Sequence, residues 1–149
     1  MFFRVDVGRV DMNGIDKSKR IIELCEKHWE QHKKNCSGYV KDIAKDLGVS
    51  LNGQANNIVD QIQKAPWKTI KSGVEAKLYA TNGMFVVAGL KDKPHGHVVI
   101  VVPGSLAHGK YPTAYWGSLG GVPKKNATIN WSWSKQDRDN VIYGAIVIK

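Results

Sequence analysis

The sequence predicts an α+β domain in which N-terminal helices pack on a C-terminal antiparallel sheet. In the first half, apolar residues recur every three or four positions, which is the period of a helix with one buried face. The second half holds runs rich in valine, isoleucine and aromatic residues, separated by turns such as Asn82-Gly83 and Lys93-Pro94. Helices that precede the strands, rather than alternating with them, are typical of this class.

Four helices are expected before the turn at Asn82-Gly83. Each combines an apolar face with a start or stop residue, for example Gly48 after the second helix and Pro66 after the third. The predicted helices are Ser18 to about Lys33, Cys36 to Leu47, Ala55 to Ile62, and Val74 to Ala80.

Five strands are expected in the second half of the chain. The first two are almost continuously apolar, which indicates strands that are covered on both faces. The predicted strands are Met84–Leu90, His97–Val102, Ala114–Ser118, Thr128–Trp133 and Asn140–Ile148. At the N-terminal end, apolar residues alternate with other residues within residues 1–14, which fits either a short strand or a loosely held arm.

The length of 149 residues fits one domain with a core that needs no disulfide. We assign residues 1–17 to an N-terminal arm of uncertain role and residues 18–149 to a single domain. Cys25 is in phase with the apolar face of the first helix and is expected in the core, although the sequence leaves open a disulfide to Cys36. No secretory signal or transmembrane-length run is recognised, so we expect synthesis in the cytoplasm and no stable membrane insertion.

The net charge of +9 suits an anionic partner, which can be a nucleic acid, a membrane surface or a carboxylate-rich polymer such as peptidoglycan. The lysines are scattered along the chain, and no RNA-binding or helix-turn-helix signature is present. We therefore expect no nucleic-acid partner. A surface that is basic only for solubility is the alternative.

Cys36 is the candidate nucleophile because it opens a helix directly after Asn35. The unpaired N–H groups and the dipole of a helix start favour a thiolate, which is the reactive form of cysteine. His97 opens a strand and is the candidate general base and acid. A cysteine hydrolase is thus one interpretation, and a buried structural cysteine with an unrelated histidine is the other.

Several neighbours are candidates for substrate binding. Ser37 either contacts substrate or caps the helix, and His95 is either a turn residue or a rim residue of the cleft. The His95-x-His97 pair lacks enough partners for zinc, so no metal and no cofactor are expected. Trp131 and Trp133 would share one face of the predicted strand Thr128–Trp133, as a substrate platform or as core, and Trp116 poses the same choice nearer to His97.

A family resemblance rests on motifs that occur in order from about residue 20 to 145. The specific ones are the Asn-Cys-Ser-Gly-Tyr-Val block around Cys36 and the Gly-His-Val block at His97. The other matches are Asp46-Leu47-Gly48-Val49, Ala55-Asn56, Val59-Asp60, Gly83–Lys91, Lys110-Tyr111-Pro112, Gly117-Ser118 and Asp137-Arg138-Asp139. In these motifs the chain resembles the first family of type VI secretion amidase effectors, which are peptidoglycan amidases similar to the papain-like NlpC/P60 cysteine peptidases.

This resemblance implies an NlpC/P60 fold and hydrolysis of the γ-D-glutamyl–meso-diaminopimelate bond of the peptidoglycan stem. It places the nucleophile on Cys36 and the base on His97. It further implies delivery by the type VI machinery to the periplasm of a Gram-negative cell and a cognate immunity protein. The alternatives are an amide hydrolase or deamidase acting on a protein, and a non-catalytic cell-wall binding module.

The chain departs from the pattern of these relatives at the polar group that would orient the His97 ring. This group should come from the next strand, where the sequence offers Thr113 to Ser118 with partly apolar side chains in phase. A backbone carbonyl, Thr113 or Ser118 remain as alternatives.

Overall fold

The structure is a computed structural model that describes residues 12–149. Most of the expected N-terminal arm, residues 1–11, lies outside the described residues. The two cysteines are unpaired, which rules out the disulfide that the sequence left open, and Cys25 is fully buried as expected. No helix within residues 12–149 has the length and apolarity needed to cross a membrane.

All four predicted helices form, and the α+β class is confirmed. They are α1 (Met12–His32), α2 (Cys36–Asp46), α3 (Ala55–Gln61) and α4 (Gly73–Thr81). The first begins earlier than the predicted Ser18 because its start packs against the turn after α4. A Cβ placed on Gly83 would lie 2.6 Å from the carbonyl oxygen of Gly14, so this tertiary contact holds a helical turn that local propensity alone would not favour.

Within the described residues, the sheet has six antiparallel strands in the order β1-β6-β2-β3-β4-β5. The strands are β1 (Lys68–Ile70), β2 (Phe85–Leu90), β3 (His97–Val101), β4 (Thr113–Trp116), β5 (Lys124–Thr128) and β6 (Ile142–Ile146). Four of them, β2, β3, β4 and β6, overlap predicted strands. The edge strand β1 was not anticipated, because three residues paired only with β6 carry too short a pattern to recognise.

The prediction of a strand over Thr128–Trp133 is wrong. Strand β5 ends at Thr128, and the chain then forms a 3₁₀ turn over Ile129–Trp131, in which the N–H of Ser132 donates to the carbonyl of Ile129. The alternating apolar residues therefore do not share a face. Trp131 is 68% exposed, whereas Trp133 is buried.

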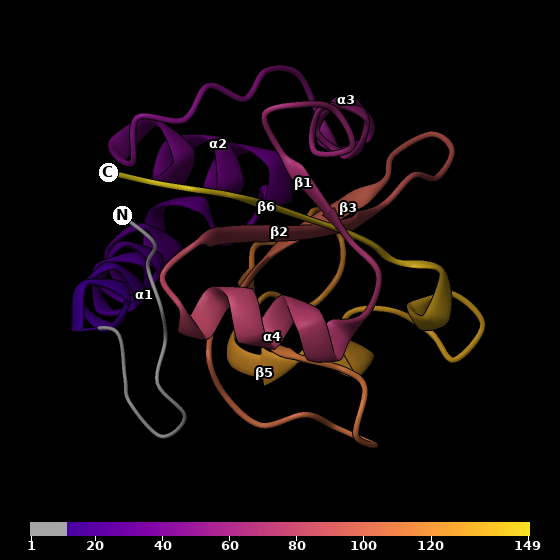
Figure 1. The fold of residues 1–149 in the computed structure, drawn as a ribbon. Helices are drawn as coiled ribbons and strands as arrows, with labels where there is room; N and C mark the ends of the chain where they lie inside the picture. Colours follow the sequence, from indigo (N-terminus) through magenta and orange to yellow (C-terminus); the bar gives the residue numbers. More distant parts are fainter. Residues whose placement is uncertain (1–11) are drawn as a thin grey trace.

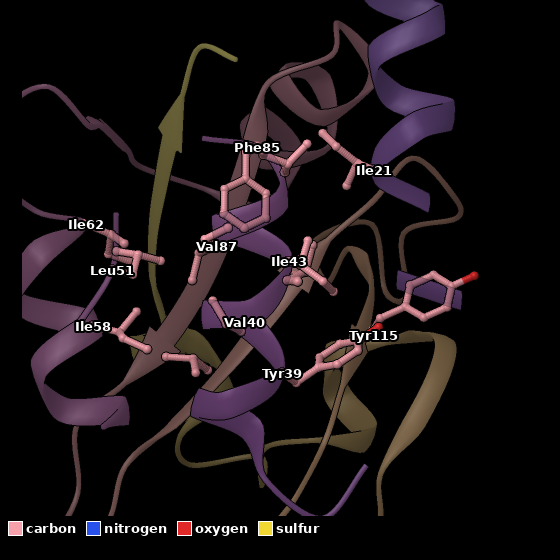
Figure 2. Packing of buried hydrophobic residues seen from close by; sticks show 14 of the residues in the cluster. Ile21, Tyr39, Val40, Ile43, Leu51, Ile58, Ile62, Phe85, Val87 and Tyr115 are labelled. Atoms are coloured by element: carbon pink, nitrogen blue, oxygen red, sulfur yellow. The ribbon is translucent and has the colours of Figure 1, made fainter. Parts of the chain in front are cut away.

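Helices cover both faces of the sheet (Figure 1). One face packs against α1, α2 and α3, and the other packs against α4 and the segment from Ile129 to Val141. Figure 2 shows part of the first core, in which Val40 and Ile43 of α2 lie near Val87 of β2, while Tyr39 points toward Tyr115. Strands β2 and β3 are buried on both faces, as their continuous apolar runs predicted.

The end of β4 is joined closely to the connection between α1 and α2. A Cβ on Gly117 would overlap the carbonyl oxygen of His32, and the N–H of Ser118 donates to the carbonyl of Lys33 at 2.9 Å. The indole Nε1 of Trp29 donates to the carbonyls of Trp116 and Lys124, at 3.2 and 3.1 Å. These contacts fix the start of α2 relative to the sheet.

We expect Gly117→Ala to lower the free energy of unfolding by about 1–3 kcal/mol, because the new methyl group meets backbone that cannot move independently. Gly48→Asn is the matched control. Gly48 has a φ of +75°, but a Cβ placed on it would have no atom within 4 Å, and asparagine tolerates this conformation. Urea unfolding of both variants checks the difference, and equal stabilities would contradict the proposed close contact.

Candidate active site

Cys36 is the first residue of α2, as predicted, and Asn35 caps this helix. The Asn35 Oδ1 accepts hydrogen bonds from the N–H of Gly38 at 3.0 Å and from the Ser37 hydroxyl at 3.1 Å. Gly38 is needed here because a Cβ would lie 2.8 Å from the Asn35 amide nitrogen. The local sequence Asn-Cys-Ser-Gly therefore builds a fixed helix start that holds Cys36 in place.

The Cys36 thiol is nearly buried, and burial raises its pKa above the ordinary value. Hydrogen bonds from the backbone N–H groups of Val98, Ser37 and Cys36 itself act in the opposite direction but do not outweigh burial. The expectation that the helix start makes this thiol acidic is therefore wrong for the resting protein. The sulfur nevertheless faces the N–H groups that would stabilise a thiolate once it forms.

His97 is the first residue of β3, and its ring packs between two tryptophans. The ring centroid lies 5.1 Å from that of Trp133 and 6.5 Å from that of Trp116, both in edge-on geometry. Burial lowers the pKa of His97 from 6.5 to about 4, because the charged imidazolium would lose its hydration there. At neutral pH the ring is therefore uncharged and able to accept a proton.

The structure brings Cys36 and His97 into one cleft of about 680 Å³. The backbone N–H of Val98 lowers the pKa of Cys36, so the thiol lies beside the residue that follows His97. All six predicted site residues line this cleft: Asn35, Cys36, Ser37, His95, His97 and Trp116. The resting pair combines a protonated thiol with a neutral imidazole, which can act as a nucleophile and its general base.

The candidate substrate-binding residues play different structural parts within the cleft. The Ser37 hydroxyl donates to Oδ1 of Asn35, which is the residue that caps α2, so Ser37 is not the cap that one alternative expected. His95 is an exposed rim residue in the loop before β3. Trp116 is buried, and its indole Nε1 donates to the carbonyl of Val122 at 3.0 Å, so it supports the His97 ring from behind.

Two supporting elements were not found from the sequence. Trp133 packs on His97, which only the turn at Ile129–Trp131 makes possible. Asn56 in the first turn of α3 clamps the loop before His97, since its side chain exchanges two hydrogen bonds with the backbone of Asp92, at 2.9 and 3.1 Å. The Ala55-Asn56 pair at the start of a helix could be recognised in the sequence. That Asn56 binds the loop at Asp92 could not, because the two segments are far apart along the chain.

The opposite wall and rim of the cleft combine amides with exposed apolar side chains. Gln54, Asn56 and Asn57 come from the start of α3. Leu119, Val122 and Trp131 are 75%, 66% and 68% exposed. Amides suit the carbonyl and N–H groups of a peptide, and exposed apolar groups beside a cleft are typical of a ligand-binding surface.

Thr113 does not orient the His97 ring. Its hydroxyl donates to the carbonyl of Ser105 at 2.8 Å, and its own carbonyl accepts from Val102, at the end of β3 remote from His97. Strand pairing thus carries this side chain away from the cleft. Ser118 lies two residues beyond β4 and lines the cleft, so it remains a candidate for this part.

The chain shows a clear similarity to one known protein. It is 34% identical over 143 residues to the peptidoglycan amidase Tse1 of Pseudomonas aeruginosa, and the match covers 89% of this chain and 91% of that protein. No protein-family model matches the chain.

We predict an acid-dependent loss of stability that originates from His97. Its pKa is about 4 in the folded chain against 6.5 as the reference value, so the unfolded chain binds more protons between these values and stability falls as pH falls through this window. The expected loss is about 2 kcal/mol at pH 5 relative to pH 8. Urea unfolding at both pH values measures it.

His97→Asn is the matched variant for this measurement because it removes the titrating group while keeping a polar side chain. It should lack the loss of stability that His97 causes. An equal loss in the wild type and in His97→Asn would show that His97 is not held neutral by burial.

Proposed function

This chain belongs to the family of peptidoglycan amidase Tse1, and we propose that it is a peptidoglycan amidase that cleaves an amide bond of the peptide stem with Cys36 as nucleophile and His97 as general base. The observation that carries this proposal is the single cleft shared by both residues. The arrangement resembles the papain-like NlpC/P60 peptidases, in which a helix start meets a sheet.

The first step is attack by the Cys36 sulfur on the scissile carbonyl carbon while His97 takes the thiol proton. Because burial favours the protonated thiol and the neutral imidazole in the resting pair, His97 has to take this proton during the reaction. His97 then gives the proton to the leaving amine as the C–N bond breaks. Water, deprotonated by His97, attacks the thioester, and the sulfur leaves to regain the proton.

The oxyanion that develops on the carbonyl oxygen needs hydrogen-bond donors at the helix start. The Asn35 side chain occupies the N–H of Gly38, whereas the N–H groups of Cys36 and Ser37 are directed to the sulfur. These two groups are therefore the proposed oxyanion donors. The Asn35 cap also fixes the first turn of α2, which contains the N–H groups of Cys36 and Ser37.

The proposed bond is the γ-D-glutamyl–meso-diaminopimelate linkage of the stem. A stem peptide carries free carboxylates, which suit a chain of net charge +9. Trp131, with the ammonium of Lys124 5.6 Å from its ring, offers an exposed face at the rim of the cleft. Amides at the start of α3 can pair with the peptide groups on the other side.

The biological setting that we propose rests on the resemblance of the sequence motifs to those of type VI secretion amidase effectors. We propose an antibacterial effector of the type VI secretion machinery that acts in the periplasm of a target Gram-negative cell. A cognate immunity protein would protect the producing cell by blocking the cleft. The described helices contain no membrane-spanning candidate, so no insertion step is part of this proposal.

Cys36→Ala should abolish cleavage of purified Gram-negative muropeptides because it removes the attacking sulfur. Mass spectrometry of the digests should show a split between D-glutamate and diaminopimelate with the wild type alone. Cys25→Ala is the control, since Cys25 is buried away from the cleft and its loss should spare the activity.

Either of two results would overturn this mechanism. Cleavage by Cys36→Ala would exclude the thiol as nucleophile. Intact muropeptides with folded wild type would favour a protein substrate, or a binding module whose attachment to the cell wall weakens with salt.

Asn35→Ala should reduce turnover, whereas Ser72→Ala should not, although both remove a helix cap. Ser72 caps α4 by accepting from the N–H of Glu75 at 3.2 Å. Each variant should lose about 0.5–2 kcal/mol of stability. If the two variants are equally stable and only Asn35→Ala loses turnover, the loss results from the changed helix start at Cys36. Equal turnover in both variants would contradict a role of the Asn35 cap in catalysis.

A further inference from the structure

Two histidines of α1 and two aspartates of α2 face each other across the interface of these helices. His28 Nε2 lies 2.7 Å from Asp46 Oδ2, and His32 Nε2 makes a short contact with Asp42 Oδ2. None of the four residues lines the catalytic cleft. The proposed reaction does not use this cluster.

The spacing of three of the four residues, His28, His32 and Asp42, matches that of metal ligands. Residues four positions apart lie on the same face of a helix. His28 and His32 therefore share one face of α1, and Asp42 and Asp46 share one face of α2. The two imidazole centroids are 6.2 Å apart. One ligand atom from each of His28, His32 and Asp42 lies within 4.8 Å of the other two.

We propose that this cluster is a binding site for a divalent transition metal, Zn²⁺ in the first instance, with His28, His32 and Asp42 as ligands. Zinc binds imidazole nitrogen and carboxylate oxygen at about 2.0–2.2 Å, in tetrahedral geometry. Asp46 or a water molecule completes the four ligands. Imidazole ligands favour zinc, copper or nickel over calcium and magnesium.

The burial and charge of the site fit this assignment. The side chains of His28 and His32 are 13% and 19% exposed, and those of Asp42 and Asp46 are 43% and 38% exposed. The rings are therefore held in place, while the carboxylates can move to close the coordination sphere. Two carboxylates balance the charge of one divalent cation.

A metal here would replace the present His–Asp hydrogen bonds between α1 and α2 with metal–ligand bonds. Helix α2 begins at Cys36, so the site would stabilise the element that carries the nucleophile without touching the cleft. A ligand that binds only the folded chain raises its unfolding temperature in proportion to the logarithm of ligand concentration over Kd. This inference does not depend on the proposed peptidoglycan activity.

The test titrates ZnCl₂ into the full chain carrying Cys36→Ala, which keeps the catalytic thiol from competing for the metal. Calorimetry should show one site. His28→Ala, His32→Ala and Asp42→Asn should each weaken binding at least about tenfold, since even outer-shell partners of a metal contribute tenfold or more. His108→Asn is the control because His108 is exposed, lies outside the cluster and has a φ of 52°, which asparagine tolerates.

A second measurement needs no change to the cluster and therefore works even if a ligand variant fails to fold. NMR of the histidine rings during the same titration should show shifts at His28 and His32 and none at His95 and His97. No binding of ZnCl₂, unchanged binding in both histidine variants, or ring shifts confined to His95 and His97 would each overturn the proposal. In that case the pairs act only as hydrogen-bonded ties between the helices.

Discussion

The contact between the end of β4 and the connection from α1 to α2 positions the rest of the site. Gly117 allows backbone to touch backbone there, and the Trp29 indole ties the same strand end to α1. Because this junction fixes the start of α2 against the sheet, the Cys36 sulfur reaches the backbone of β3 at Val98. The proposed nucleophile on a helix then shares a cleft with the proposed base on a strand.

Burial governs the chemistry of this pair more than the helix start does. It keeps the Cys36 thiol protonated and the His97 ring neutral, so the ionised pair is not present before substrate arrives. In the proposed reaction, the N–H groups of α2 offset part of the cost of desolvating the charges that form. The two tryptophans that pack edge-on against His97 contribute to its burial.

Much of the fold and of the site was predictable from local patterns. The four helices, the central strands and the positions of Cys36 at a helix start and His97 at a strand start follow from periodicity and stop residues. The strand predicted over Thr128–Trp133 failed because alternating apolar residues also fit a short turn with one tryptophan in and one out. The alternative that Thr113 orients the His97 ring failed because strand pairing decides where a side chain lies. The pairing of β3 with β4 places the Thr113 hydroxyl beside the carbonyl of Ser105.

The sequence by itself determined the candidate catalytic residues and the family that the chain resembles. Both can be recognised locally, because helix caps, periodicity and motifs each involve only a few neighbouring residues. Only the tertiary structure decided that Trp133 supports His97, that Asn56 clamps its loop, and that His28 and His32 face two aspartates. It also decided the protonation of the pair. These features depend on burial and on contacts between distant segments, and such terms are absent from any local stretch of the chain.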